Sequence, residues 1–454
     1  MNKVGTDTIK MLLPITKTAN PSGFPVKCER QGGLIRSQRR RLIRRSILVV
    51  PILLAILSTN CRMTEKTETL LPATQPDNQP TDAGAIHRRA IAIDMHADTA
   101  QRLVDEHVDL NERLPDGHFD SVRAREGGLD AQFFSIWVEP ELFGGGGASA
   151  MKRADDQIAA VKALAEKRPE IWELATTAAD IKRIASADKL AALTGLEGGY
   201  AIDEKIENVE RYYTLGVRYM SPAWSVSTSW AGSSGDDIGR TRGLNDFGKQ
   251  VIREMNQLGM MVDVSHVSDP TFWDIVNTST RPVIATHSGC RAIANVPRNL
   301  TDDMIRALAK TGGVVNVIFY PEHLEPGWSE KKKKVDAEIA SAVQHASEEE
   351  KGDAAHKKLA RDRVRREEYA KRLPPVTVSR LVDHIDHIVK LVGIDYVGIG
   401  SDFDGVQSTL SDLADVSQLP NLTRELLRRG YSESDVDKIL GGNMLRVMEK
   451  VERN

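Results

Sequence analysis

Short apolar runs recur along the chain between about residues 90 and 400, and most of them are continuous rather than alternating. Continuous runs of this length are typical of strands that are buried on both faces of a parallel sheet. Eight of them predict strands, at residues 91–94, 131–138, 190–196, 218–223, 260–264, 282–285, 313–319 and 396–400.

The segments between these runs carry the periodicity and the start signals of helices. Asn245 precedes an amphipathic segment that Gly259 closes, Thr301 precedes another, and residues 376–392 lead into the last strand. Eight strands alternating with helices predict an α/β fold, a (β/α)8 barrel of the TIM type. An open doubly wound sheet is the alternative, but no G-x-G-x-x-G turn follows the first strand.

Two segments stand outside this alternation. Residues 330–372 are dense in charges of both signs and predict a charged helical insertion after the seventh strand. Since acids are interleaved throughout, a solvated surface helix is favoured over a nucleic-acid site. Residues 143–149 are glycine-rich but lack the Lys-Ser/Thr of a phosphate-binding loop, which predicts a flexible loop.

Acidic and imidazole side chains stand at or just past the ends of five predicted strands. They are His96, Asp98, Glu197, His266, His287 and Asp402. Such residues are costly to bury without a partner, and the carboxyl ends of barrel strands meet at one face. We therefore expect them to converge on one site, and their mixed nitrogen and oxygen ligands suit zinc, with manganese or cobalt as substitutes.

The spacing of these residues supports a metal site. His96 and Asp98 are two residues apart, so on a strand both point to one side. Glu197 has two oxygens and can bridge two cations, and its flanking glycines allow close approach of the backbone. His266 and His287 can supply nitrogen ligands to a second ion, and Asp402 remains as a further carboxylate.

Taken singly, each candidate has an ordinary structural interpretation. A lone histidine at a strand end is usually a core or capping residue, Asp98 could cap a helix, and Asp402 could form a turn. Their common place at one end of one barrel weakens these interpretations together. His384 and His387 have the spacing of a metal pair, but we interpret them as part of an ordinary helix.

The N-terminal region differs from the rest in charge. The chain has 454 residues and a net charge of −3, but the first 60 residues carry eleven Lys/Arg against two acids, so the remainder carries −12. Basic residues followed by about thirteen apolar ones predict a secretion signal, because a membrane span needs roughly 20. Cys61 follows and resembles a lipoprotein acceptor, although Asn60 precedes it; an uncleaved anchor is the alternative.

We predict three regions: residues 1–61 as an N-terminal extension with a signal peptide or lipoprotein signal, 62–85 as a flexible linker, and 86–454 as the catalytic domain. An exported protein of the cell envelope or periplasm, lipid-anchored at Cys61 in one alternative, follows from this division. With only three cysteines no disulfide framework is expected, and the acidic remainder gives no sign of nucleic-acid binding.

Several motifs together resemble one family. They are DMHAD, REGGLDAQFFSIWV, GLEGG, VDVSH, ATHSGCRAI with NVPRNLTDD, LPPVTVSRLVDHIDHIVKLVGIDYVGIGSDFDGV and GGNMLRVME. Their order is that of the membrane (renal-type) dipeptidase family, peptidase family M19, over about residues 91–451. The resemblance implies a (β/α)8 barrel with two zinc ions that cleaves dipeptides, and a homodimer.

The resemblance also implies a role for each matching residue. His96 and Asp98 would bind the first zinc, Glu197 would bridge both ions, and His266 and His287 would bind the second. Asp402 would be the catalytic acid and base, and Arg298 would hold the substrate carboxylate. Trp224 stands where many members have a substrate-contacting histidine, which puts substrate range and rate in question.

The chemistry implied is metal-assisted hydrolysis of an amide, in which two cations lower the pKa of a shared water. One alternative is a barrel amidohydrolase that acts on a non-peptide amide or lactam. Another is an envelope binding lipoprotein that kept the barrel and lost catalysis. A serine hydrolase is disfavoured because no G-x-S-x-G elbow is present.

Overall fold

The structure is a computed structural model that describes residues 82–452, and these residues lie within one compact unit. The predicted signal, Cys61 and most of the predicted linker lie outside the described residues. The first described helix, α1 (Ala83–Arg89), overlaps the end of the predicted linker and is capped by the Asp82 side chain. Between residues 82 and 452, no helix combines the length and apolarity needed to cross a bilayer.

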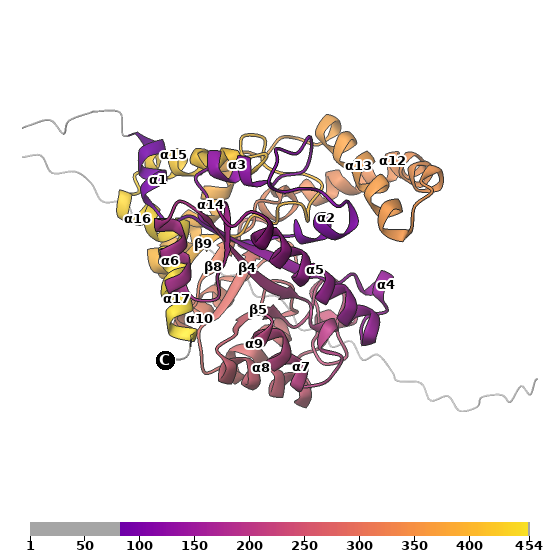
Figure 1. The fold of residues 1–454 in the computed structure, drawn as a ribbon, viewed down its shortest axis with the longest axis horizontal. Coiled ribbons are helices and arrows are strands. Elements are labelled where there is room, and N and C mark those ends of the chain that lie inside the picture. The colour runs from indigo at the N-terminus through magenta and orange to yellow at the C-terminus, as the bar shows by residue number, and fades with distance from the viewer. Residues whose placement is uncertain (1–81, 453–454) are drawn as a thin grey trace, which may run out of the picture. The chain divides into compact units, whose positions relative to one another are not determined.

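Parallel strands form the centre of the fold (Figure 1). In order around the barrel they are β1 (Ile93–Ala97), β2 (Ala131–Trp137), β4 (Leu190–Glu197), β5 (Val217–Ser221), β6 (Met261–Asp263), β7 (Val283–Ser288), β8 (Val315–Val317) and β9 (Val397–Ile399). The ring closes just past β9, where Ala97 bridges to Phe403 and the Asp98 amide donates to the Phe403 carbonyl at 2.8 Å. The predicted (β/α)8 barrel is confirmed.

All eight predicted strands are present, with ends that differ by a few residues. One further strand, β3 (Trp172–Leu174), was not predicted; it pairs with β4 outside the ring. It has three residues, too few for a period to show in the sequence.

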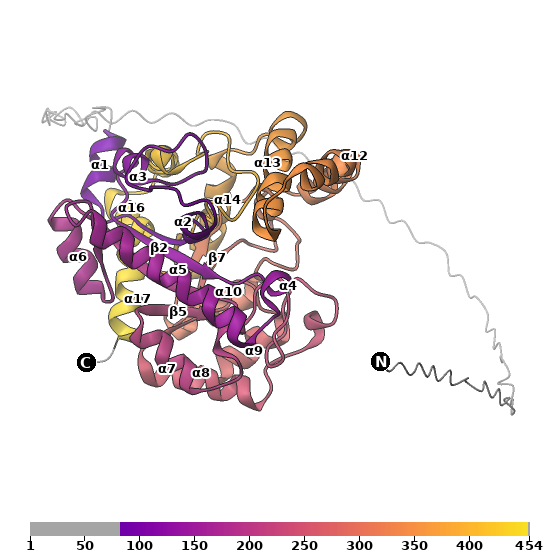
Figure 2. The ribbon, with the colours of Figure 1, turned by 45° about the vertical axis from the view of Figure 1, so that its right-hand side comes forward.

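Helices surround the strands (Figures 1 and 2). They are α2 (Ala100–Asp105), α3 (Ser121–Glu126), α4 (Pro140–Phe143), α5 (Gly147–Lys167), α6 (Ala178–Ser186), α7 (Glu207–Thr214), α8 (Asp246–Leu258), α9 (Asp269–Thr278), α10 (Asp302–Thr311), α11 (Pro321–Leu324), α12 (Trp328–Glu349), α13 (Ala354–Arg372), α14 (Val378–Val392), α15 (Pro420–Arg428), α16 (Glu433–Asp437) and α17 (Asn443–Val451). The predicted caps are in place, since Asn245 accepts from the Gly248 amide and Thr301 accepts from the Met304 amide.

The C-terminal helix α17 covers the amino ends of the strands. Its Met444 and Met448 belong to one buried cluster with Ile93 at the start of β1 and Val314 just before β8. This leaves the carboxyl ends of the strands, at the other end of the barrel, as the open face.

The predicted insertion forms helices α12 and α13, which pack against each other after β8, the seventh strand of the ring. Figures 1 and 2 show this pair, in orange, projecting to one side of the barrel. Trp328, Val335, Ile339 and Val343 form a buried apolar stripe on α12, which explains why so charged a segment folds here.

Asp94 holds the closing seam of the barrel together. This buried carboxylate accepts hydrogen bonds from the Ser401 amide at 2.8 Å, the Ser401 hydroxyl at 2.6 Å and the His96 amide at 3.2 Å. Asp94→Ala removes all three hydrogen bonds, of which only that of the Ser401 hydroxyl has a second acceptor, the His96 carbonyl at 3.1 Å. We therefore expect the free energy of unfolding to fall by about 2–4 kcal/mol. Urea unfolding of Asp94→Ala measures this change, with the exposed Glu112→Ala as the control. Equal stability of the two variants would contradict the prediction.

Candidate active site

The six predicted strand-end residues meet at the carboxyl face of the barrel. His96 lies in β1 and Asp98 follows it, Glu197 ends β4, His287 lies in β7, and His266 and Asp402 stand three residues after β6 and β9. Asp402 is half-buried, and the other five side chains are buried. The structure thus brings together every residue of the predicted metal site.

Glu197 occupies the centre of this group. Its Oε1 lies 2.7 Å from His266 Nε2 and 3.6 Å from His287 Nε2. Its Oε2 lies 3.3 Å from His96 Nε2, which in turn is 3.9 Å from Asp98 Oδ1. Two triads of ligand atoms, each within 4.8 Å, therefore share Glu197: His96, Asp98 and Glu197, and Glu197, His266 and His287.

The donor atoms of these triads fit a metal site. His96 Nε2 and Asp98 Oδ1 are buried and have no hydrogen-bond partner in the described chain. His266 Nε2 and His287 Nε2 face each other at 3.0 Å. Buried polar atoms without partners are costly, and a cation would satisfy both His96 Nε2 and Asp98 Oδ1. The nitrogen and oxygen donors of both triads are ligands that zinc prefers.

Three of the five candidate ligands are held by a further hydrogen bond, whereas Nδ1 of His266 has no partner in the described chain. Tyr219 Oη lies 2.9 Å from His96 Nδ1, Thr286 Oγ1 lies 2.8 Å from His287 Nδ1, and the Ser135 hydroxyl donates to Glu197 Oε2 at 2.9 Å. Such contacts orient the ligating atoms toward the centre. Sequence reasoning missed all three, although the glycines around Glu197 were a signal: a Cβ on Gly195 would lie 2.0 Å from the Tyr219 ring.

Burial and neighbouring charges set the protonation of the cluster in the metal-free chain. Burial acts to raise the pKa of Glu197, but His96 and His266 outweigh it and lower that pKa, so Glu197 stays ionised. Burial lowers the pKa of His266 to about 4, which leaves it neutral, the form that ligates metals. Burial alone would lower the pKa of His96, but Glu197 and Asp98 raise it to about 10, so it holds a proton that a cation would displace.

Asp402 reaches the cluster from a strained loop. It has a φ of 62°, in the left-handed region that aspartate tolerates better than most residues. A Cβ on Gly405 would lie 2.2 Å from Asp98 Oδ2 and 2.4 Å from Asp402 Oδ1, so the loop needs glycine there. Burial raises the pKa of Asp402 to about 7, and one of its oxygens lies within 4.8 Å of ligand atoms of His96 and His287.

Arg298 and Trp224 flank the cluster. The Arg298 guanidinium donates to Ser288 Oγ at 3.0 Å and to the His287 carbonyl at 2.9 Å, while its Nε is buried without a partner in the described chain. Burial lowers its pKa to about 10, which still leaves a cation at neutral pH. The Trp224 ring lies 6.3 Å from that of His266 and 4.7 Å from that of Trp137.

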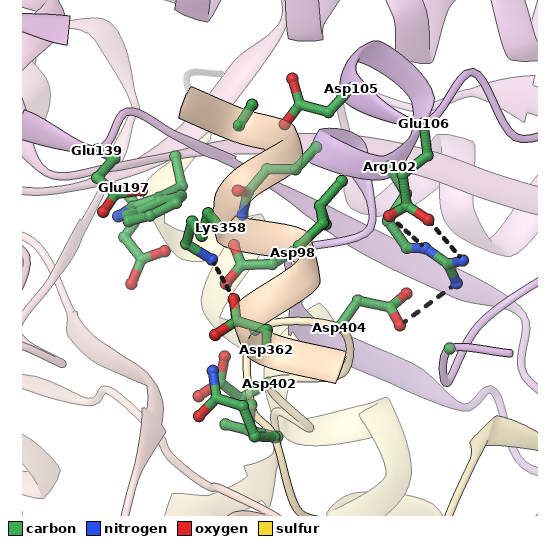
Figure 3. A pocket seen from close by; sticks show the side chains of 18 of the residues that line it. Asp98, Arg102, Asp105, Glu106, Glu139, Glu197, Lys358, Asp362, Asp402 and Asp404 are labelled. Atoms are coloured by element: carbon green, nitrogen blue, oxygen red, sulfur yellow. Dashed lines mark hydrogen bonds and ion pairs between the residues drawn. The ribbon is translucent and has the colours of Figure 1, made fainter. Parts of the chain in front are cut away.

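A cavity of about 300 Å³ opens over the cluster, and Asp98, Glu197, Trp224, His266 and Asp402 line its floor and wall. Helix α13 contributes Lys358, Leu359, Asp362, Arg365 and Arg366 to the same cavity. Figure 3 shows Lys358 and Asp362 on this helix beside Asp98. The interpretation of the insertion as a solvated face is therefore wrong for this side of α13, since its charges face the site.

His384 and His387 do not form a metal pair. Both lie on α14, where His384 binds the Cys290 amide through Nδ1 and the Leu324 carbonyl through Nε2. His387 Nε2 lies 2.8 Å from Asp302 Oδ1. The interpretation of this segment as an ordinary helix is confirmed.

A closed parallel barrel that gathers imidazoles and carboxylates at the carboxyl ends of its strands has the architecture of a barrel metalloenzyme. The chain belongs to the family described as membrane dipeptidase (peptidase family M19), whose model matches residues 81–454. The resemblance drawn from the sequence motifs is thereby confirmed.

Individual relatives agree with this membership. Dipeptidase 3 of Rattus norvegicus is 32% identical over 335 residues, which is 73% of this chain but 58% of the relative's length. Dipeptidase 3 of Homo sapiens gives the same identity and coverage. Among solved structures, the probable dipeptidase PvdM of Pseudomonas aeruginosa is 26% identical with a TM-score of 0.67, over 81% of this chain and 97% of that one.

A metallo peptidase of Rhodobacter sphaeroides, liganded with a phosphinate mimic of the dipeptide L-Ala-D-Ala, has a TM-score of 0.65 at 23% identity, over 80% of this chain and 100% of that one. At that identity the likeness concerns the fold alone.

Proposed function

We propose that this chain hydrolyses the amide bond of dipeptides that have a free C-terminal carboxylate, with two zinc ions as cofactors. The observation that carries the proposal is the shared position of Glu197 between two triads of ligand atoms. His96 and Asp98 would hold one ion, His266 and His287 the other, and Glu197 both. Family membership supports the metallopeptidase class.

The chain's own residues suit the remaining steps of amide hydrolysis. Bound cations would supply a polarised substrate carbonyl and a water that ionises near neutral pH. Asp402, with a pKa raised to about 7 by burial, can take a proton from the attacking water and give it to the leaving amine. Trp224 lines the cavity with an apolar ring, and its indole cannot serve as a general acid.

The proposal is tested by metal analysis of purified protein together with a panel of dipeptides and N-acyl amino acids. We expect two zinc ions per chain and turnover of dipeptides. One metal ion per chain, or none, would contradict the proposal that Glu197 holds two ions. Fully loaded protein that cleaves no amide would favour a binding lipoprotein that has lost catalysis.

A second candidate function is hydrolysis of a non-peptide amide or lactam. The observation in its favour is Trp224, an indole where many members of the family have a histidine, on the wall beside His266. Faster turnover of N-acyl amino acids or lactams than of any dipeptide in the same panel would favour this candidate.

Arg298 is proposed to bind the substrate carboxylate through its partly unpaired guanidinium. We expect Arg298→Met to raise KM for dipeptides by about 10- to 100-fold, the loss typical of a hydrogen bond to a charged group. Dipeptide amides, which lack the carboxylate, should show little change. Steady-state kinetics on both substrate forms measures this, with the exposed Arg306→Met as control; equal losses on both forms would contradict the role.

We further propose that residues 1–61 direct export to the cell envelope or periplasm as a signal peptide or as a lipoprotein signal with Cys61 as the lipid acceptor. We also propose that 62–85 form a linker and that 86–454 act as a homodimeric domain. The basic and apolar segment before Cys61 supports the export signal. Intact mass measurement of the mature chain distinguishes cleavage, lipidation and retention of this region, and sedimentation gives the oligomeric state.

A further inference from the structure

Glu139 lines the catalytic cavity with a carboxylate that nothing in the described chain satisfies. Its Oε2 is buried without a hydrogen-bond partner, and between residues 82 and 452 its side chain makes no hydrogen bond or ion pair. Glu139 precedes α4 as its N-cap residue, and its backbone carbonyl accepts from the Phe143 amide, but its side chain does not cap that helix. The carboxylate therefore has no evident structural role.

The cavity-wall cation that most affects the Glu139 carboxylate already has a partner. Lys358 of α13 donates to Asp362 Oδ2 at 2.7 Å and lies 5.7 Å over the Trp137 ring. Asp362 in turn accepts from Arg365 at 2.9 Å. Burial raises the pKa of Glu139, and the positive charge of Lys358 acts to lower it, although the two side chains form no ion pair. Figure 3 shows Glu139 and Glu197 on the same side of the pocket.

The strand register relates Glu139 to the ligand cluster. The Cα of Trp137, two residues earlier, is paired with that of Glu197. Glu139 is extended, so its Cα lies about 7 Å further along the strand, above the layer of the ligands. A substrate whose scissile carbonyl reached the cluster could place its N-terminal residue, which carries ammonium groups, in the space between.

We propose that Glu139 accepts an ammonium group of the substrate's N-terminal residue, and that it is a specificity-determining residue of this cavity. The inference rests on the proposed function for the orientation of the substrate. A buried carboxylate oxygen without a partner is costly in the free protein, and a charged donor from the ligand removes that cost. The ammonium can be the α-amino group or that of a lysine side chain, and the experiment separates the two.

The test compares Glu139→Gln with Glu141→Gln, an exposed glutamate two residues further on. The probes are phosphinate analogues of Ala-Ala, of its N-acetyl form, of Lys-Ala and of norleucyl-Ala, titrated by calorimetry into the metal-loaded protein. We expect Glu139→Gln to weaken the free-ammonium analogues by about 10- to 100-fold and to leave the N-acetyl analogue unchanged. Glu141→Gln should change none.

Loss confined to the Lys-Ala analogue assigns Glu139 to the side-chain ammonium, and loss of all free-amine analogues assigns it to the α-ammonium. Equal losses with and without the amine, or no loss, overturn the proposal. A fall in Tm in Glu139→Gln would indicate a structural role and would also count against it. Because these are binding measurements, they do not depend on turnover. A wild type that cleaves no dipeptide would contradict the proposed function but would not decide the role of Glu139.

Discussion

Replacing Glu197 with alanine is expected to lower kcat/KM for amide hydrolysis by at least about 1,000-fold, since several kcal/mol of transition-state stabilisation would depend on the ions it holds. The triad with His96 and the triad with His266 have only Glu197 in common. One Glu197 oxygen lies 2.7 Å from His266 Nε2, and the other lies 3.3 Å from His96 Nε2. Its loss should therefore lower the content of both metals.

Metal analysis of the purified variant and steady-state kinetics check this expectation together. Glu141→Ala, an exposed substitution, is the matched control and should keep full metal content and rate. Circular dichroism separates loss of metal from loss of the fold, because helices such as α17, which covers the opposite ends of the strands, do not depend on the site. Full activity with two bound ions in Glu197→Ala would refute the bridging role.

The ligands of the candidate site could be found from the sequence because each carries its signal locally. In a parallel barrel a buried strand must end at the catalytic face, so an apolar run followed by His96, Glu197 or Asp402 already gives the residue's place in space. The barrel itself followed from the same runs. The short strand β3 was not predicted from the sequence, because three residues that pair with β4 outside the ring are too few to show a pattern.

The rest of the site depends on contacts between distant segments, which no local pattern encodes. Tyr219 reaches His96 from a strand 123 residues further along the chain. Lys358 and Asp362 come from an insertion whose charges, read alone, predict a solvated helix; only packing of α13 over the cavity turns one face of it inward. The single sequence hint was that Lys358, Asp362 and Arg365 share one helical face, a pattern that exposed helices also show.

Replacing Asp402 with asparagine should separate proton transfer from metal binding. Asp402 is half-buried and belongs to the ligand group of His96 and His287 but to neither triad that contains Glu197. Both of those triads therefore remain complete without it. We expect Asp402→Asn to lower kcat by about 100- to 10,000-fold, the contribution typical of a general acid and base, while metal content stays at the wild-type level.

The matched control is Asp395→Asn, an exposed aspartate near the opposite end of the same strand β9. Rapid-quench or steady-state kinetics with metal analysis measures both variants, and KM should move far less than kcat if the carboxylate acts in the chemical step. Loss of metal in parallel with rate would instead make Asp402 a ligand. A full rate in Asp402→Asn would require another base, and no other carboxylate of the described residues joins His96 and His287 in a ligand group.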